Sequence, residues 1–257
     1  MSEFNEKNLL EISTMLETAT KNVEKVYKSG YTVGHTEGFD KGGYDKGYDK
    51  GKKDAYDLFW DAYQEKGKCK SYTHAFAGNG WNNDTFNPKY DIKVSYGYMM
   101  FRDCAVTGNL DEALAKSNVK IDFTKLYDAP YLFSQCAFSK IGILDLSNLS
   151  YLNNTFTGSK NLHTIEELII KDECKINNPF SQCTALRNLK ITGNIGENLD
   201  LHWSVELTHD SIINVIDCLV DYSGSGKTFI LTLGEANLAK LSDIEKEIAT
   251  GKGWTLV

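Results

Sequence analysis

The chain has 257 residues, a formal net charge of −7 and a pI near 5.3. This acidic balance argues against nucleic acid as the main partner, because phosphate contacts need clustered Lys and Arg. No apolar run reaches the ~20 residues that span a bilayer, and the first residues lack the basic start and apolar core of a secretory signal. We therefore expect neither a membrane span nor a signal peptide.

The first segment, residues 1–53, predicts a coiled-coil helix. Its apolar seam alternates spacings of three and four residues and consists of Leu9, Ile12, Leu16, Ala19, Val23, Val26, Gly30 and Val33. This heptad pattern predicts self-association through residues 5–51, with a trimer as our guess at the number of copies. The other interpretation is an amphipathic helix that packs on its own domain.

Glycine recurs at almost every fourth position from Gly30 to Gly51. Seven glycines would cost a helix roughly 5–7 kcal/mol relative to alanine, which favours a flexible linker. Their regular spacing instead forms one stripe on a helix, along which a neighbouring helix can approach closely. We expect a helical stalk and keep the linker as the alternative.

Residues 54–100 are rich in aromatic side chains. They predict a cap on the repeats that follow, because a first repeat has no neighbour to cover its core. The alternative is a carbohydrate site, since exposed aromatic rings can stack on sugars.

Residues 101–205 repeat one pattern, in which a Phe is followed three positions later by Cys or Ser and then by an apolar strand. The pairs are Phe101 and Cys104, Phe133 and Cys136, Phe156 and Ser159, and Phe180 and Cys183. The last three Phe are 23 and 24 residues apart, a period typical of leucine-rich repeats. We expect strands at 119–124, 143–147, 167–171, 188–192 and 198–202, and a helical turn at 108–117. The cysteines share one inward position, which predicts buried reduced thiols.

Residues 206–257 depart from the repeat. Thr208 predicts the N-cap of a helix over 212–219. A strand at 228–233, a helix over 235–250 ended by Gly251, and a strand at 254–257 should then close the last open edge as a β-α-β unit. The expected fold is therefore α/β: a leucine-rich-repeat solenoid with an N-terminal helical stalk and a β-α-β C-terminal cap.

These repeats resemble the BspA-like leucine-rich-repeat family of bacteria and their phages. The segments Tyr56-Asp-Leu-Phe-Trp-Asp61, Gly80-Trp81, Phe86-Asn-Pro-Lys-Tyr90 and Trp254-Thr255 are similar to a group of phage and prophage proteins from low-GC Gram-positive hosts. The resemblance implies a non-enzymatic structural protein of a phage or phage-like particle, placed in the tail or baseplate of the virion after cytoplasmic synthesis. The implied partners are other tail proteins and a host-surface glycan or protein.

Signals of catalysis are weak. The segment Gly224-Ser-Gly-Lys-Thr228 is similar to a phosphate-binding loop, but Asp221 stands where that motif needs its first glycine. No motif predicts a metal or a cofactor, and we expect neither. A soluble intracellular scaffold or inhibitor is the second hypothesis. A hydrolase of cell-wall glycans is the third, because the separation of two carboxylates is invisible in a sequence.

The outward positions of the expected strands form the candidate binding face. Along a strand, apolar residues point inward and alternate with exposed ones, so stacking predicts columns of polar side chains. The predicted columns contain Lys120, Asp122, Thr124, Ile143, Asp145, Ser147, Glu167, Ile169, Lys171, Asn188, Lys190, Thr192, Asp200 and His202. This mixture suits a protein or glycan ligand, and the alternative is a face that is merely solvated.

Overall fold

The structure is a computed structural model that describes residues 75–78, 81–84, 86, 88, 91–172 and 174–257. The chain divides into two units, Met1–Cys69 and Lys70–Val257, and every described residue belongs to the second. The predicted stalk over 1–53, with its seam from Leu9 to Val33 and its glycine stripe, lies outside the described residues. Of the segment 54–100, only the part from Ala75 onward is described.

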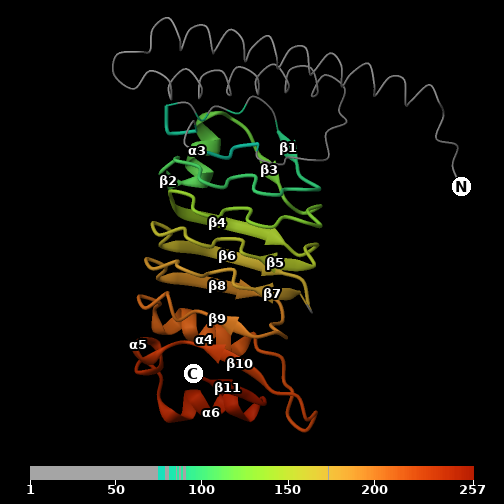
Figure 1. Ribbon diagram of the computed structural model, residues 1–257, viewed down its shortest axis with the longest axis vertical. Coiled ribbons are helices and arrows are strands. Elements are labelled where there is room, and N and C mark those ends of the chain that lie inside the picture. The colour runs from blue at the N-terminus through green and yellow to red at the C-terminus, as the bar shows by residue number, and fades with distance from the viewer. Residues whose placement is uncertain (1–74, 79–80, 85, 87, 89–90, 173) are drawn as a thin grey trace, which may run out of the picture. The chain divides into compact units, whose positions relative to one another are not determined.

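A four-stranded parallel sheet runs through the described unit (Figure 1). Its order is β2 (Gly108–Asn109), β4 (Phe138–Leu146), β6 (Thr164–Ile170) and β8 (Asn188–Thr192). Leu144 lies opposite Leu168, which lies opposite Ile191, and all three are buried. The described unit is thus α/β with parallel sheets, as expected, and the strands expected at 143–147, 167–171 and 188–192 are neighbours.

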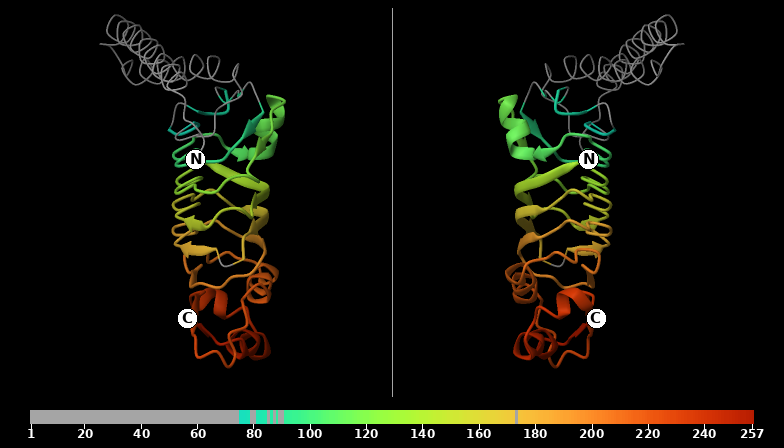
Figure 2. Two further views of the ribbon diagram at one scale, coloured as in Figure 1. Left: turned by 90° about the vertical axis from the view of Figure 1, so that its right-hand side faces the viewer. Right: turned by 90° about the vertical axis from the view of Figure 1, so that its left-hand side faces the viewer.

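Shorter strands form a second row beside this sheet. In this row β5 (Tyr151–Asn153) pairs with β7 (Lys175–Asn177). Strand β1 (Ile92–Lys93) pairs with β3 (Ile121–Asp122), and β3 lies beside the end of β4, because Asn148, just after β4, donates to the carbonyl of Thr124, just after β3. Strand β9 (Leu199–Asp200) pairs with β10 (Phe229–Thr232), which pairs with β11 (Trp254–Leu256). Between Phe138 and Asp200 the chain alternates between the two rows, so that β4, β6 and β8 are followed by β5, β7 and β9 (Figure 2).

The repeated Phe forms one buried column between successive turns of the chain. The ring centroids of Phe101 and Phe133 are 4.9 Å apart, those of Phe133 and Phe156 are 5.7 Å apart, and those of Phe156 and Phe180 are 5.4 Å apart. The planes of the last pair differ by 1°. Each ring therefore covers both the turn before it and the turn after it.

The aromatic residues of the described N-terminal segment close the first end of this column. Phe76 stacks on Phe101 at 5.0 Å, and Trp81 and Phe86 pack edge-on against Phe76 at 5.5 and 5.2 Å. All three are buried. These rings cover Phe101 at this end of the column, and their burial leaves none of the three exposed for stacking on a sugar.

The cysteine position forms a second inner column. Cys104, Cys136 and Cys183 are buried free thiols, as expected. The Cys183 thiol donates to the Phe156 carbonyl at 3.1 Å, and the hydroxyl of Ser159 donates to the Phe133 carbonyl at 2.6 Å. Ser159 therefore substitutes for cysteine because a hydroxyl can satisfy the same type of carbonyl.

Burial makes these thiols inert, and we expect alkylation of the folded protein to spare them. Desolvation raises the pKa of Cys104 to about 12, of Cys136 to about 11 and of Cys183 to about 12, from an ordinary value of 9.0. Iodoacetamide near pH 8 should modify half-buried Cys218 first, because only thiolates react. Peptide mass spectrometry measures the order in which the thiols are modified. Equal rates of modification at Cys104, Cys136, Cys183 and Cys218 would contradict this prediction.

The raised pKa values of these thiols also predict how the stability of the protein changes at alkaline pH. A thiol whose pKa is raised by folding stabilises the protein fully below its unfolded pKa near 9.0, and that contribution is lost as the pH rises toward 12. Unfolding free energy should therefore fall with rising pH in this window, and less steeply in a Cys183→Ser variant.

The last strand of the four-stranded sheet is covered by a helix instead of another strand. Helix α4 (His209–Asp217) begins at Thr208, whose side chain accepts from the Ser211 amide as the expected N-cap. Along this edge, the Leu189 amide donates to the Ser211 hydroxyl at 3.0 Å. The side-chain amide of Asn214 accepts from the Ile191 amide at 2.6 Å and donates to its carbonyl at 3.2 Å. Asn214 thus substitutes for the peptide group of a neighbouring strand.

Replacing Asn214 by Ala should cost about 1–3 kcal/mol of unfolding free energy, because the Ile191 amide would lose its partner and the Ile191 carbonyl would keep only the Cys218 thiol as a donor. Urea denaturation followed by circular dichroism measures the loss. Asn188→Ala is the matched control, because it removes an exposed side-chain amide from β8, the strand that contains Ile191. This change should alter the free energy of unfolding by about 0.5 kcal/mol or less. Equal losses in both variants would contradict this role for Asn214.

The C-terminal β-α-β unit is present with one correction. Strands β10 and β11 are parallel, and β10 joins β9 to β11. The single helix expected over 235–250 is wrong: the chain forms α5 (Glu235–Leu238) and α6 (Asp243–Gly251). Ser242 caps α6 and forms a capping box with Glu245, which starts a new helix and ends the old one. The expected helical turn at 108–117 is α3 (Leu110–Lys116).

Candidate binding surface

The predicted binding residues lie in or beside the strands β3, β4, β6, β8 and β9, and their use as a binding face stays a prediction. Asp145, Glu167, Ile169, Asn188, Lys190 and Thr192 lie in the four-stranded sheet, and Ser147 and Lys171 directly follow β4 and β6. Lys120, Asp122 and Thr124 lie in or beside β3, and Asp200 and His202 lie in or after β9. The first strand of the large sheet is β2, which the sequence reasoning did not identify.

The exposed face of this sheet is centred on Glu167. Its carboxylate accepts from the Thr192 hydroxyl at 2.6 Å and pairs with the Lys190 ammonium at 3.0 Å, so one side chain of β6 contacts two of β8. These two hydrogen bonds, that of Thr192 first, lower the pKa of Glu167. Both donors come from the neighbouring turn, so the contact orders side chains across the sheet.

Two isoleucines stand among these charges. Ile143 is 67% exposed and lies opposite Glu167, whereas half-buried Ile169 lies opposite Asp145. Apolar and acidic side chains therefore alternate diagonally across β4 and β6. This face therefore presents exposed apolar surface next to charged side chains.

Towards α3 the same face holds a second ion pair. The Lys140 ammonium lies 2.5 Å from the Glu166 carboxylate. Asp111, on α3, accepts a backbone hydrogen bond from Gly142, and burial raises the pKa of this carboxyl. A side chain at Gly142 would occupy the space of that carboxylate, because an added Cβ would meet Asp111 Oδ2. A larger residue at this position would therefore displace the Asp111 carboxylate from its contact with β4.

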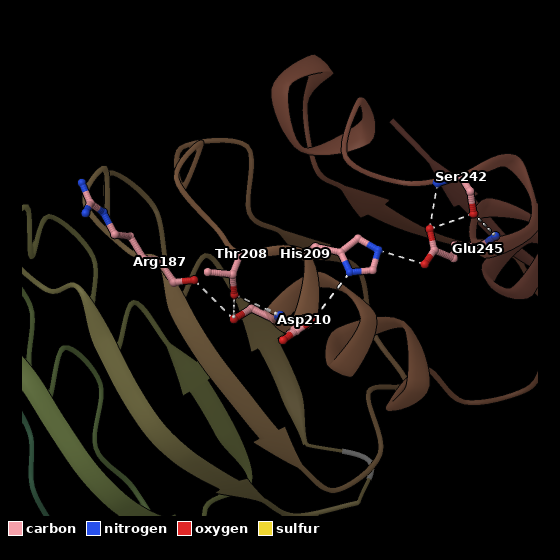
Figure 3. Close-up of polar contacts among 7 residues, drawn as sticks. Arg187, Thr208, His209, Asp210, Ser242 and Glu245 are labelled. Carbon is pink, nitrogen blue, oxygen red and sulfur yellow. Dashed lines mark hydrogen bonds and ion pairs between the residues drawn. The ribbon is translucent and has the colours of Figure 1, made fainter.

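One further cluster of polar side chains joins α4 to α6 (Figure 3). The His209 ring nitrogen Nε2 lies 2.8 Å from Glu245 Oε1, and its Nδ1 lies 3.6 Å from the Asp210 carboxylate. The Ser242 hydroxyl and amide both donate to Glu245 Oε2, at 2.8 and 2.7 Å. A nucleophilic serine needs a histidine as its base, but here a carboxylate lies between the two, so the cluster serves as a helix cap.

His202 also forms a local contact. Its ring Nδ1 lies 2.6 Å from Asp200, and the ring lies 4.8 Å from that of Trp203. The segment 223–228, which is similar to a phosphate-binding loop, follows α4 and precedes β10. Among the described residues a strand follows this segment in place of the helix whose N-terminus would bind phosphate.

No protein-family model matches the chain, and searches of curated proteins and of solved structures also find no match. Within the described part of the chain, no group of three or more His, Cys, Asp or Glu side chains is placed to hold a metal ion. Every helix of that part is too short or too polar to cross a membrane. Function must accordingly be inferred from the residues and their geometry.

Proposed function

We propose that residues 101–205 form a leucine-rich-repeat solenoid of the BspA-like type, which serves as a non-enzymatic binding module. The Phe column supports this proposal, because stacked rings 4.9–5.7 Å apart join turns of 23 and 24 residues into one unit. The two rows of short parallel strands support it as well. Solenoids of this kind bind ligands on extended strand faces rather than in closed pockets.

The face around Glu167 is the proposed contact with a protein partner. Its exposed Ile143 supplies an apolar anchor, and the Lys190 and Lys140 pairs supply charges of both signs around it. This combination of apolar centre and charged rim is typical of transient protein interfaces. Ile143→Asp should abolish such a contact without unfolding the protein, because the side chain is 67% exposed.

We further propose that the protein is a component of a phage or phage-like particle, located in the tail or baseplate. Segments similar to phage and prophage proteins support this role. The predicted seam over residues 5–51 would join copies, with a trimer as the expected state, and the repeat face would contact a tail protein or the host surface.

Quantitative mass spectrometry of purified particles from the induced source strain tests this role. We expect a fixed ratio to the other tail proteins, with copies in multiples of a trimer. Abundant protein in the cytosol but none in particles would reject the virion role and favour an intracellular scaffold or inhibitor. Release of reducing sugar from purified cell wall by the protein would instead favour a hydrolase.

A further inference from the structure

The second row of strands carries exposed tyrosines in successive turns of the chain. Tyr127 is 60% exposed and Tyr151 is 56% exposed, and they are 24 residues apart, which is one repeat. Tyr96, in the preceding turn, has its ring centroid 6.2 Å from that of Tyr127. An exposed tyrosine offers an apolar ring face for stacking and a hydroxyl for hydrogen bonds.

Two hydrogen bonds place Tyr127 and Tyr151 in adjacent turns of the chain. The side chain of Asn148 donates to the Thr124 carbonyl, and the Tyr131 amide donates to the Asn153 carbonyl at 3.0 Å. Residues 124–131 therefore run beside residues 148–153, with Tyr127 and Tyr151 in adjacent turns. On the other side, Tyr96 forms a parallel bridge with Asp128. The rings of Tyr96 and Tyr127 are therefore neighbours and Tyr151 lies in the next turn, and we name these three residues the tyrosine stripe.

The surroundings of the tyrosine stripe are polar but electrically balanced. The Lys175 ammonium, opposite Tyr151 in β7, is paired with Glu197. The pKa of the Asp122 carboxyl is lowered mainly by its hydrogen bonds with Thr124. The positive charges of Lys93 and Lys125 lower it further. Each cation therefore has an acidic neighbour. A strongly charged ligand would find no excess of opposite charge here.

Uncharged hydrogen-bonding groups lie beside the rings. The side-chain amide of Asn177 donates to that of Asn153 at 2.9 Å, which links β5 to β7 on the outward side. Exposed Asn148 and Ser150 precede Tyr151. Sugar rings present C–H groups on their faces and hydroxyls at their edges, so they need aromatic rings flanked by neutral donors and acceptors. The stripe offers both, and its charge balance matches a neutral sugar.

We propose that the tyrosine stripe binds a neutral linear glycan, whose successive sugar rings stack on Tyr127 and Tyr151. This site is separate from the face around Glu167 and does not depend on a role in a phage particle. The ligand class follows from the rings, the amides and the absence of net charge at this surface.

The test uses the full chain with three neutral hexasaccharides (maltohexaose, cellohexaose and chitohexaose) and an anionic oligogalacturonate. Saturation-transfer NMR detects binding, and calorimetry measures the affinity. We expect binding to at least one neutral sugar. Tyr127→Ala and Tyr151→Ala should each weaken it about threefold to tenfold, whereas Tyr127→Phe and Tyr151→Phe should retain most of the affinity because the ring remains.

Controls separate the tyrosine stripe from the other face. Ile143→Ala also removes exposed bulk, but from the four-stranded sheet, and should leave sugar affinity unchanged. Melting curves by circular dichroism show whether each variant is folded. The proposal is overturned if no neutral sugar binds at about 1 mM, if the oligogalacturonate binds best, or if Ile143→Ala alone weakens binding.

Discussion

Phe156→Ala should lower the free energy of unfolding by about 3–5 kcal/mol. The ring is fully buried and lies between those of Phe133 and Phe180, with interplanar angles of 3° and 1°. Its removal would leave a cavity bounded by stacked rings, which cannot close without separating the turns. If residues 101–205 form the proposed solenoid, in which neighbouring turns supply the contacts, the loss should also uncouple the turns on either side.

Urea denaturation of the full chain, followed by far-ultraviolet circular dichroism, measures this loss. Ile143→Ala is the control, because its side chain is 67% exposed and should change stability by about 0.5 kcal/mol or less. The stability loss in Phe156→Leu should lie between those in Phe156→Ala and Ile143→Ala, since the leucine side chain fills part of the cavity. A loss below about 1 kcal/mol in Phe156→Ala would show that the column does not hold the turns together.

Gly193→Ala should destabilise the protein by about 2–5 kcal/mol, through backbone strain and overpacking. Gly193 follows β8 with φ at +123°, a conformation that side chains rarely adopt. An added Cβ would lie 2.5 Å from the Ile170 carbonyl oxygen and 2.9 Å from Ile170 Cγ1. The oxygen belongs to the backbone of β6, so relief requires the sheet to move.

Gly224→Ala is the matched control for this change. Gly224 also has positive φ, at +73°, but nothing lies within 4 Å of an added Cβ. Its cost should be only that of left-handed strain, about 1 kcal/mol. Thermal unfolding of both variants separates strain from collision, and equal shifts in melting temperature would show that the collision at Gly193 is relieved without cost.

The sequence predicted the parts of the fold that follow from one repeated signal. The Phe and Cys positions, the strands near Leu144, Leu168 and Ile191, and the N-cap at Thr208 were all expected and are all present. Each depends on a local rule, either a fixed period or a capping side chain. Such rules need no knowledge of which strand pairs with which.

The sequence did not separate β9 from the strands of the large sheet, because both rows use the same pattern. Residues 198–202 alternate apolar and polar side chains, just as the strands of the large sheet do, but β9 pairs with β10 instead. Strands β5 and β7 have three residues each, too few for a periodic signal. The distance from the preceding Phe would have separated them, since β6 and β8 both begin eight residues after Phe156 and Phe180.

Two other signals were present in the sequence but were not used. Ser242 and Glu245 have the spacing of a capping box, which predicts the start of α6 and the break in the expected helix. Tyr127 and Tyr151 are one repeat apart, which places them in adjacent turns. The partner of an edge strand is harder to predict, because the contact of Asn214 with Ile191 depends on how α4 packs.

The column of rings has a consequence for how such a molecule can change in length. Leu144 and Leu168 are 24 residues apart and directly paired, and Phe156 and Phe180 repeat the same step. The upper and lower surfaces of a turn are therefore complementary to each other. A tandem duplication of 24 residues within this region would meet matching surfaces on both sides and raise the stack by about 4.8 Å. The reach of the protein can thus be altered by whole turns, while both ends keep their own closures.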